Sequence, residues 1–254
     1  MVNTQKPVMT VGVLTASESR SMDAGQIADL INYLADFLTS ERKTKIERVI
    51  AHRTRYITVA LEDIHTSQNA GAVLRNCDNF GIQDIHIIEQ TTNFKVNLNV
   101  TRGCQKWLTT YRYKNQQNNT HSCINTLKEQ GYCVVATTPH TDACKLPDLP
   151  LNRPIALLFG NELDGLSDTA LAQADQHLKI PMYGFSESFN ISVSTALCLQ
   201  SICDLIHQSS YPWQLSPAEQ QLLKLDWYRN SCKHLQQVEA GFWQAQARQE
   251  LQYP

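Results

Sequence analysis

Three short segments gather the polar side chains that could do chemistry. Residues 65–75 (HTSQNAGAVLR) place Asn69 at the expected start of a helix and Arg75 about a turn and a half into it. The other two segments are 159–167 (FGNELDGLS) and 180–194 (IPMYGFSESFNISVS). An arginine can clamp a phosphate, while amides and hydroxyls can orient a hydroxyl group. Glycines let the backbone approach a ligand closely, so these segments are candidates for a binding site.

Each of these side chains also has a purely structural explanation. Arg75 could be a surface cation, and Asn69 could serve only as the cap of its helix. Glu162 could be a turn residue. The polar residues of the third segment could form only the N-terminal cap of the helix that follows, namely Ser188, Asn190 and Ser192.

Missing motifs and spacings disfavour several other chemistries. The sequence contains no GxGxxG, no GxxxxGK[ST] and no GxSxG, which argues against a dinucleotide-binding Rossmann enzyme, a P-loop NTPase and an α/β hydrolase. The eight cysteines form no CxxC pair and no zinc-like spacing with histidine, so we expect reduced thiols and no metal site. His65 and His86 are expected to be structural, and Glu62 and Asp63 are expected to be solvated rather than catalytic.

The elements that must position the three segments alternate between strands and helices. Apolar or β-branched runs predict strands at 57–61, 84–88, 132–137, 155–159 and 177–181. Helical spacing is found at 70–80 and 122–130, a capped helix is expected at 167–174, a long helix should end near 207, and 115–121 is expected to be an exposed turn. This alternation predicts a mostly parallel sheet covered on both faces, which binds ligands at the C-terminal ends of its strands.

Length and composition suit one α/β core with helical extensions. The chain has 254 residues, of which 42% are hydrophobic and 18% charged, and it has no apolar run long enough to span a membrane. We divide it into a leader of unknown role (1–22), an N-terminal helical extension (23–54) that begins with an amphipathic helix at 25–42, the α/β domain (55–208) and a C-terminal helical extension (209–254). Reduced thiols favour a cytoplasmic location.

Positive charge is concentrated although the net charge is −2. Residues 41–55 hold six basic and two acidic side chains, and residues 90–128 hold six basic and no acidic ones. A solvated face explains such patches as well as a surface that follows RNA phosphates. On the second interpretation, the candidate RNA contacts are Arg42, Lys43, Arg53, Arg55, Lys95, Arg102, Lys106 and Arg112.

Taken in order, the three segments match a known set of motifs. They read NxGAxxR at 69–75, FGxExxGLS at 159–167 and IPMxGxxxSxNxSV at 180–193. The sequence thus resembles the SpoU, or TrmH, branch of the SPOUT superfamily, whose members methylate RNA ribose 2′-oxygens with S-adenosylmethionine. The resemblance spans about residues 45–208, and the helical flanks are most similar to those of the subgroup that acts on tRNA. Phe189 departs from the usual leucine of the third motif but remains apolar.

The resemblance implies a SPOUT-type parallel sheet with a deep trefoil knot in its C-terminal half, and a homodimer. It implies that S-adenosylmethionine is bound by Thr137, Gly160, Ile180, Met182 and Phe189. It assigns the reaction to Arg75, with Asn69, Glu162, Ser188 and Asn190 completing a polar wall. Because a guanidinium does not readily lose its proton, we expect Arg75 to clamp a phosphate and position the hydroxyl.

The expected activity is therefore 2′-O-methylation of RNA, most specifically at guanosine 18 in the tRNA D-loop. Methylation of 23S rRNA or of the tRNA wobble ribose is the alternative within the same chemistry. A non-catalytic RNA-binding relative is the alternative of another class. The expected partners are tRNA or rRNA and a second copy of the chain, with no membrane and no metal.

Overall fold

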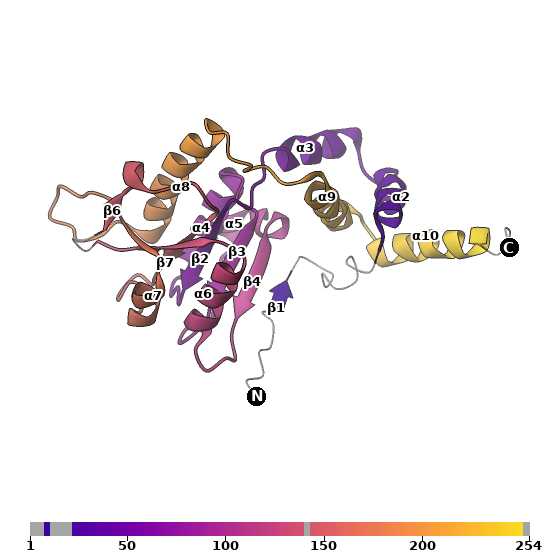
Figure 1. Cartoon of the computed structure of the whole chain (residues 1–254). Coiled ribbons are helices and arrows are strands. Elements are labelled where there is room, and N and C mark those ends of the chain that lie inside the picture. The colour runs from indigo at the N-terminus through magenta and orange to yellow at the C-terminus, as the bar shows by residue number, and fades with distance from the viewer. Residues whose placement is uncertain (1–7, 11–21, 140–142, 251–254) are drawn as a thin grey trace. The chain divides into compact units, whose positions relative to one another are not determined.

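A sheet of eight strands forms the centre of the larger part of the chain. In this computed structural model, which describes residues 8–10, 22–139 and 143–250, the strand order is β1-β4-β3-β2-β7-β5-β8-β6 (Figure 1). The strands are β1 (Val8–Thr10), β2 (Ile57–Glu62), β3 (Asp84–Ile88), β4 (Thr109–Tyr113), β5 (Cys133–Thr137), β6 (Cys144–Lys145), β7 (Ile155–Phe159) and β8 (Gln176–Lys179). Strands β2 to β8 pair in parallel, and β1 pairs antiparallel with β4. The predicted parallel α/β sheet is confirmed.

Helices cover both faces of this sheet. The core on one face joins β2, β3 and β7 to α4 (Ser67–Asn79) and α8 (Ile191–His207). The core on the other face includes α6 (Asn119–Glu129) and α7 (Asp168–Gln173) (Figure 1). Because both faces are covered, β2 (ITVALE) is buried along its whole length, including its polar residues Thr58 and Glu62.

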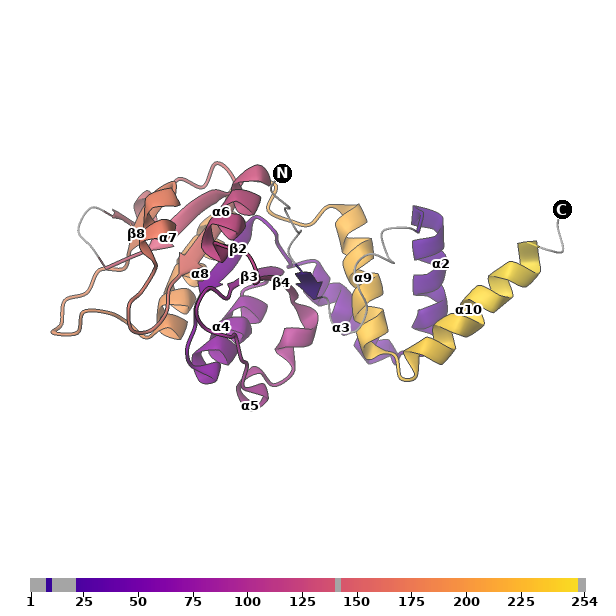
Figure 2. The same ribbon diagram turned by 90° about the horizontal axis from the view of Figure 1, so that it is seen from below.

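Short helical pieces connect β3 to β4 and β6 to β7. After β3 the chain forms α5 (Leu98–Thr101) and the 3₁₀ helix η1 (Cys104–Trp107), and η2 (Leu146–Asp148) follows β6. Helix α5 packs beside α4 (Figure 2), where a Cβ on Gly71 would lie 3.1 Å from Cβ of Val100. This close packing ties the segment after β3 to the helix that carries Arg75.

The chain divides into two compact units. The sheet unit comprises Met1–Thr10 and Arg53–Gln214, and the helical unit comprises Val11–His52 and Leu215–Pro254. The helical unit contains α2 (Ala24–Ala35), α3 (Ser40–Ile50), α9 (Pro217–Ser231) and α10 (Leu235–Glu250), with α2 packed beside α9 (Figure 2). Among the described residues, no helix combines the length and apolar character needed to cross a membrane.

Three local predictions are corrected. The helix expected at 25–42 is two helices, because Thr39 caps a new one by accepting a hydrogen bond from the Arg42 amide. Residues 115–121 are not simply an exposed turn, since α6 begins at Asn119 and both Asn119 and Thr120 are buried. The polar β4 was missed because its sequence, TTYRY, has no apolar run. Of the leader 1–22, only β1 and residue 22 lie within the described residues.

Candidate active site

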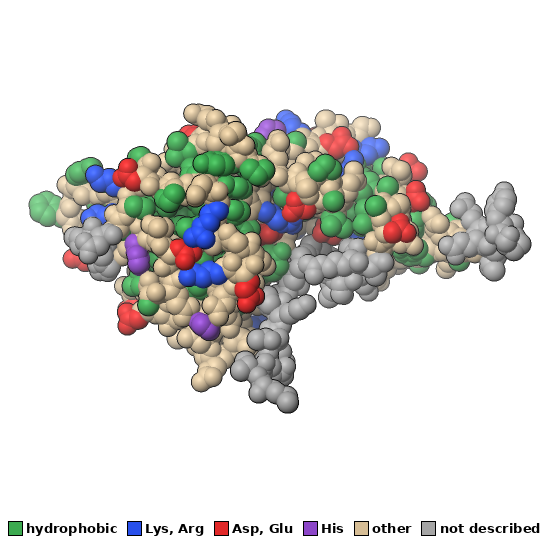
Figure 3. Space-filling model, in the orientation of Figure 1, with side chains coloured by type: hydrophobic (Ala, Val, Ile, Leu, Met, Phe, Trp, Pro, Cys, Tyr) green, Lys and Arg blue, Asp and Glu red, His purple; other side chains and the backbone are tan. Residues whose placement is uncertain are grey.

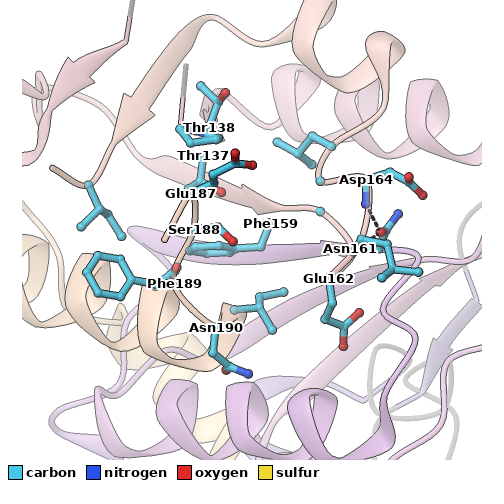
Figure 4. A pocket seen from close by; sticks show the side chains of 18 of the residues that line it. Thr137, Thr138, Phe159, Asn161, Glu162, Asp164, Glu187, Ser188, Phe189 and Asn190 are labelled. Carbon is cyan, nitrogen blue, oxygen red and sulfur yellow. Dashed lines mark hydrogen bonds between the residues drawn. The ribbon is translucent and has the colours of Figure 1, made fainter. Parts of the chain in front are cut away.

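A cavity of about 680 Å³ opens at the C-terminal ends of β2, β5, β7 and β8. All three polar segments of the sequence contribute to its lining, as does the stretch 137–139 at the end of β5. Figure 4 shows Glu187, Ser188 and Phe189 on one side of this cavity, Asn161 and Glu162 on the other, and the Phe159 ring between them. The convergence expected for a parallel sheet is thus present.

A relay of hydrogen bonds joins the three segments. Glu162 accepts hydrogen bonds from the backbone amides of His65 (3.0 Å) and Thr66 (3.1 Å), from the Thr66 hydroxyl (2.7 Å) and from Asn69 Nδ2 (2.7 Å). Asn69 Oδ1 in turn accepts from Asn190 Nδ2 at 3.1 Å. Asn190 Oδ1 accepts from the Ser192 amide (2.9 Å) and hydroxyl (2.7 Å) at the start of α8. One carboxylate therefore fixes the orientation of two amides.

The environment of Glu162 keeps its carboxylate charged. Partial burial raises the pKa of this group, but the hydrogen bonds from Asn69, Thr66 and the His65 amide outweigh burial and lower the pKa to about 2. A carboxylate with so low a pKa is a poor proton acceptor near neutral pH. Glu162 is thus suited to holding Asn69 in place, and it is not suited to general-base catalysis.

The Gly160 loop owes its shape to a close backbone approach. A Cβ on Gly160 would lie 2.0 Å from the backbone carbon of Gly165, and Gly165 has φ +74°. Asn161 and Gly165 exchange backbone hydrogen bonds of 3.0 and 3.2 Å, and Asn161 Oδ1 accepts from the amides of Leu163 and Asp164 (Figure 4). The two glycines of the FGxExxGLS motif therefore have a steric explanation.

Two acidic residues at the end of β2 hold the surrounding loops, and the expectation that they are solvated is wrong. Glu62 is 3% exposed and accepts hydrogen bonds from the Thr120 hydroxyl and from the amide and hydroxyl of Ser167. Asp63, 7% exposed, accepts from the backbone amides of residues 90–92. Their partners lie 27 or more residues away, so no local sequence pattern reveals them.

The residues predicted to bind a cofactor all line the cavity. They are Thr137, Gly160, Ile180, Met182 and Phe189. Sequence reasoning missed several neighbours that extend an apolar wall, namely Pro139, Phe159, Leu166, Leu171 and Leu178. Their place in the predicted strands could have identified some of them, because Phe159 and Leu178 lie near the C-terminal ends of strands and Pro139 follows one.

Of the residues predicted to do chemistry, one lies outside the cavity. Asn69, Glu162, Ser188 and Asn190 line it, whereas Arg75 does not. Arg75 is exposed on α4, six residues after Asn69 and thus about 9 Å further along the helix axis. A single copy of the chain brings the polar wall together without this guanidinium.

The predicted RNA contacts separate into structural and exposed cations. Arg53 is 1% exposed and binds Asp78 and the Ile82 carbonyl, which removes it from the RNA-binding set. Arg55 pairs with Asp84 at 2.9 Å, and Arg112 pairs with Glu89 at 2.6 Å. In the sheet unit, the remaining predicted contacts are exposed: Lys95, Arg102 and Lys106. In the helical unit, Arg42 is exposed, whereas Lys43 is half-buried and donates a hydrogen bond to the Ala35 carbonyl.

Comparisons with known proteins are consistent with this site. A profile of the SpoU rRNA Methylase family matches residues 56–200. A tRNA (guanosine(18)-2'-O)-methyltransferase of Borreliella burgdorferi is 40% identical over 209 residues, which cover 82% of this chain and 94% of the relative. A solved TrmH/SpoU tRNA modifying enzyme of A. aeolicus is 25% identical, with a TM-score of 0.68 over 75% of this chain and 96% of that one. An AdoMet-bound rRNA methyltransferase of Sinorhizobium meliloti, 24% identical, matches the fold with a TM-score of 0.53 over 64% of this chain and 60% of that one.

Proposed function

Because the chain belongs to the SpoU rRNA Methylase family, we propose that it methylates a ribose 2′-hydroxyl of tRNA, at guanosine 18, with S-adenosylmethionine as the donor. The observation that carries this proposal is the relay from Glu162 through Asn69 to Asn190. It assembles one polar wall from three segments that are far apart in sequence. The Borreliella relative supplies the choice of RNA and nucleotide.

The cavity fits the methyl donor. Apolar side chains from Phe159, Leu178 and Ile180 form a slot suited to an adenine ring, and Gly160 leaves backbone atoms open to a ligand. Met182 and Phe189 would bound the same ligand from the third segment, with Thr137 at the end of β5. When bound, S-adenosylmethionine supplies a methyl group that is already activated on a sulfonium.

The remaining work of the chain is orientation. Asn69 and Asn190, held by Glu162, present amides beside the cavity at the place where a ribose hydroxyl must enter. Arg75 clamps the phosphate next to the target nucleotide, as guanidinium groups do in bidentate pairs. The proton of the hydroxyl passes to water, since the Glu162 pKa is too low and a guanidinium too basic for that task.

A second copy of the chain completes the site by supplying Arg75. The support is twofold: Arg75 is exposed outside the cavity of its own chain, and α8 leaves an apolar side uncovered. Val193, Leu197 and Leu205 are 43%, 40% and 42% exposed and lie within about 120° of one another around that helix. In the proposed homodimer, this side of α8 is buried and one chain's Arg75 lies near the other chain's cavity.

The chain path through the sheet supports a knot. Strand β7 lies on one side of β5 and β8 on the other, so the connection between them, which carries the Gly160 loop and α7, must pass β5. That crossing, together with the family resemblance, leads us to infer a trefoil knot within 55–208. Single-molecule stretching between residues 55 and 208 tests it, because a knotted chain ends shorter than its full contour length.

A reducing compartment, the cytoplasm, is the proposed location. All eight cysteines are free thiols, and six of them are buried. Burial raises the pKa of the Cys198 and Cys203 thiols to about 12, which leaves them unreactive packing groups. Thiol counting on protein purified without reductant should yield eight free groups.

Labelled methyl transfer tests the function. Unmodified tRNA transcripts and, in separate reactions, 23S rRNA transcripts are incubated with the protein and methyl-labelled S-adenosylmethionine, and the label is located by nuclease digestion. We expect 2′-O-methylguanosine at position 18 and no incorporation into a transcript whose 18-ribose is 2′-deoxy. Label in 23S rRNA or at the wobble ribose would contradict the substrate, and tight tRNA binding without any transfer would indicate a non-catalytic RNA-binding protein.

A further inference from the structure

The segment between β8 and α8 exposes two aromatic rings beside the cavity. Tyr183 is 96% exposed and Phe185 is fully exposed, and the two rings flank Gly184. Met182 and Glu187, on either side of this pair, line the cavity. Figure 1 shows the segment projecting past β6, and in Figure 3 a hydrophobic side chain stands out at that end of the molecule with basic side chains behind it.

Two lysines lie side by side at the base of this segment. In the parallel pairing of β6 with β8, Lys145 is the register partner of Lys179, which places both side chains on one face of the sheet about 5 Å apart at their Cα atoms. Lys179 is next to Leu178 and Ile180, which both line the cavity, while its own side chain lies on the opposite face of β8 from that of Leu178. None of the ion pairs found among the described residues includes either lysine.

Neither feature stabilises the isolated chain. Like charges directly opposite on paired strands repel one another, and exposed aromatic rings leave apolar surface in water. Both costs are removed by one kind of ligand: an RNA strand carries phosphates for the lysines and bases with flat apolar faces for the rings. A second copy of the chain is the other occupant that could cover the rings, and the measurements below test it separately.

We propose that the protein has a contact surface for unpaired RNA next to the methylated nucleotide, formed by Tyr183, Phe185, Lys145 and Lys179. This proposal rests on the proposed function. The rings stack on one or two bases that are not paired, and the lysines neutralise the phosphates that join those bases. This surface is distinct from the basic segment 90–128, and it acts on the RNA strand at the cavity rather than on the body of the tRNA.

Binding measurements separate the two parts of this surface. Lys145→Gln together with Lys179→Gln should lower the slope of log affinity for tRNA against log salt by about 0.7 for each phosphate that is no longer neutralised. Lys233→Gln, an exposed lysine of the helical unit, is the matched control and should leave the slope unchanged. An unchanged slope in the double variant overturns the role of the lysines.

The aromatic pair needs substitutions that distinguish stacking from apolar burial. We expect Phe185→Ala and Phe185→Leu to weaken tRNA binding about 5- to 150-fold for each base that no longer stacks, and Phe185→Tyr to retain it. Their dissociation constants for S-adenosylmethionine should match that of the wild-type chain. If Phe185→Leu binds tRNA normally, or if Phe185→Ala only dissociates the dimer in light scattering, the rings serve a protein interface and the proposal fails.

The outcomes also separate this inference from the proposed function. If the wild-type protein methylates tRNA and every variant above binds tRNA normally, the proposed function stands and this inference fails. If the wild-type protein neither binds S-adenosylmethionine nor transfers a methyl group, the proposed function itself fails. Tyr183→Ala alone should give a smaller loss than the double change with Phe185→Ala, because two rings share the bound bases.

Discussion

At the scale of single residues, the carboxylate of Glu162 combines a pKa lowered to about 2 with four hydrogen bonds. Its four hydrogen bonds come from the end of the β2 loop and the start of α4. They exist in the folded chain only, so the charged form of Glu162 stabilises the fold. This dependence on charge gives a prediction with a defined sign.

We expect acid to destabilise the wild-type protein more than Glu162→Gln. The pKa of Glu162 falls from an ordinary 4.5 to about 2 on folding, so its stabilising contribution is present above pH 4.5 and is lost as pH falls toward 2. Chemical unfolding at pH 6 and pH 3 measures this difference. Asp164→Asn is the matched control, since the side chain of Asp164 has no hydrogen bond among the described residues, and equal acid sensitivity of Glu162→Gln and wild type would contradict the assignment.

The Gly160 loop gives a second prediction at the residue scale. Gly160→Ala forces a methyl group against the backbone of Gly165, which should cost about 1–3 kcal/mol of unfolding free energy and abolish binding of S-adenosylmethionine. Gly184→Ala is a control, because a Cβ there meets nothing within 4 Å. Calorimetry on both variants checks the pair, and normal donor binding by Gly160→Ala would refute the steric argument.

At the scale of elements, sequence patterns predicted what local periodicity can encode. The apolar runs at 57–61 and 155–159 became neighbouring buried strands, and Ser167 caps α7 as expected. The patterns failed where long-range contacts decide the outcome. The polar β4 is a strand because β3 and β1 pair with it, and residues 119–120 are buried because Glu62 and Glu89 bind them.

The residues of the candidate site were likewise predictable where local patterns decide and unpredictable where long-range contacts decide. Motif spacing identified the residues that line the cavity, because residues at the ends of parallel strands must meet at one edge. It could not distinguish Arg53, whose partner Asp78 lies 25 residues away, from a cation that binds RNA. Charge patches in a sequence record composition, whereas burial and pairing decide which members of a patch are free to bind.

Arg53 and Arg102 should therefore respond differently to substitution. Arg53→Met leaves Asp78 without its buried partner and should lower the unfolding free energy by about 3 kcal/mol. Arg102→Gln, at an exposed position after α5, should leave stability unchanged and weaken tRNA binding. Denaturant unfolding and tRNA binding are measured on both variants. Loss of tRNA affinity without loss of stability in Arg53→Met would contradict the structural role of Arg53.

At the scale of the whole molecule, the separation of Arg75 from the cavity determines how many copies of the chain make one site. If each chain supplied its own Arg75, a chain with either Arg75→Ala or Asn190→Ala would be inactive alone and in any mixture. If the arginine comes from the partner, mixing the two inactive variants creates dimers in which one site carries both substitutions and the other carries none.

Mixed dimers of Arg75→Ala and Asn190→Ala are therefore expected to regain methyl transfer. Random exchange between equal amounts of the two variants makes half of the dimers mixed, each with one intact site, so activity should return to about a quarter of the wild-type value per chain. The measurement is labelled methyl incorporation after the variants are unfolded and refolded together, with each variant refolded alone as the control. Absence of recovery, with mixed dimers verified by distinct affinity tags, would place Arg75 in the site of its own chain and would require the α4 helix to move toward the cavity when RNA binds.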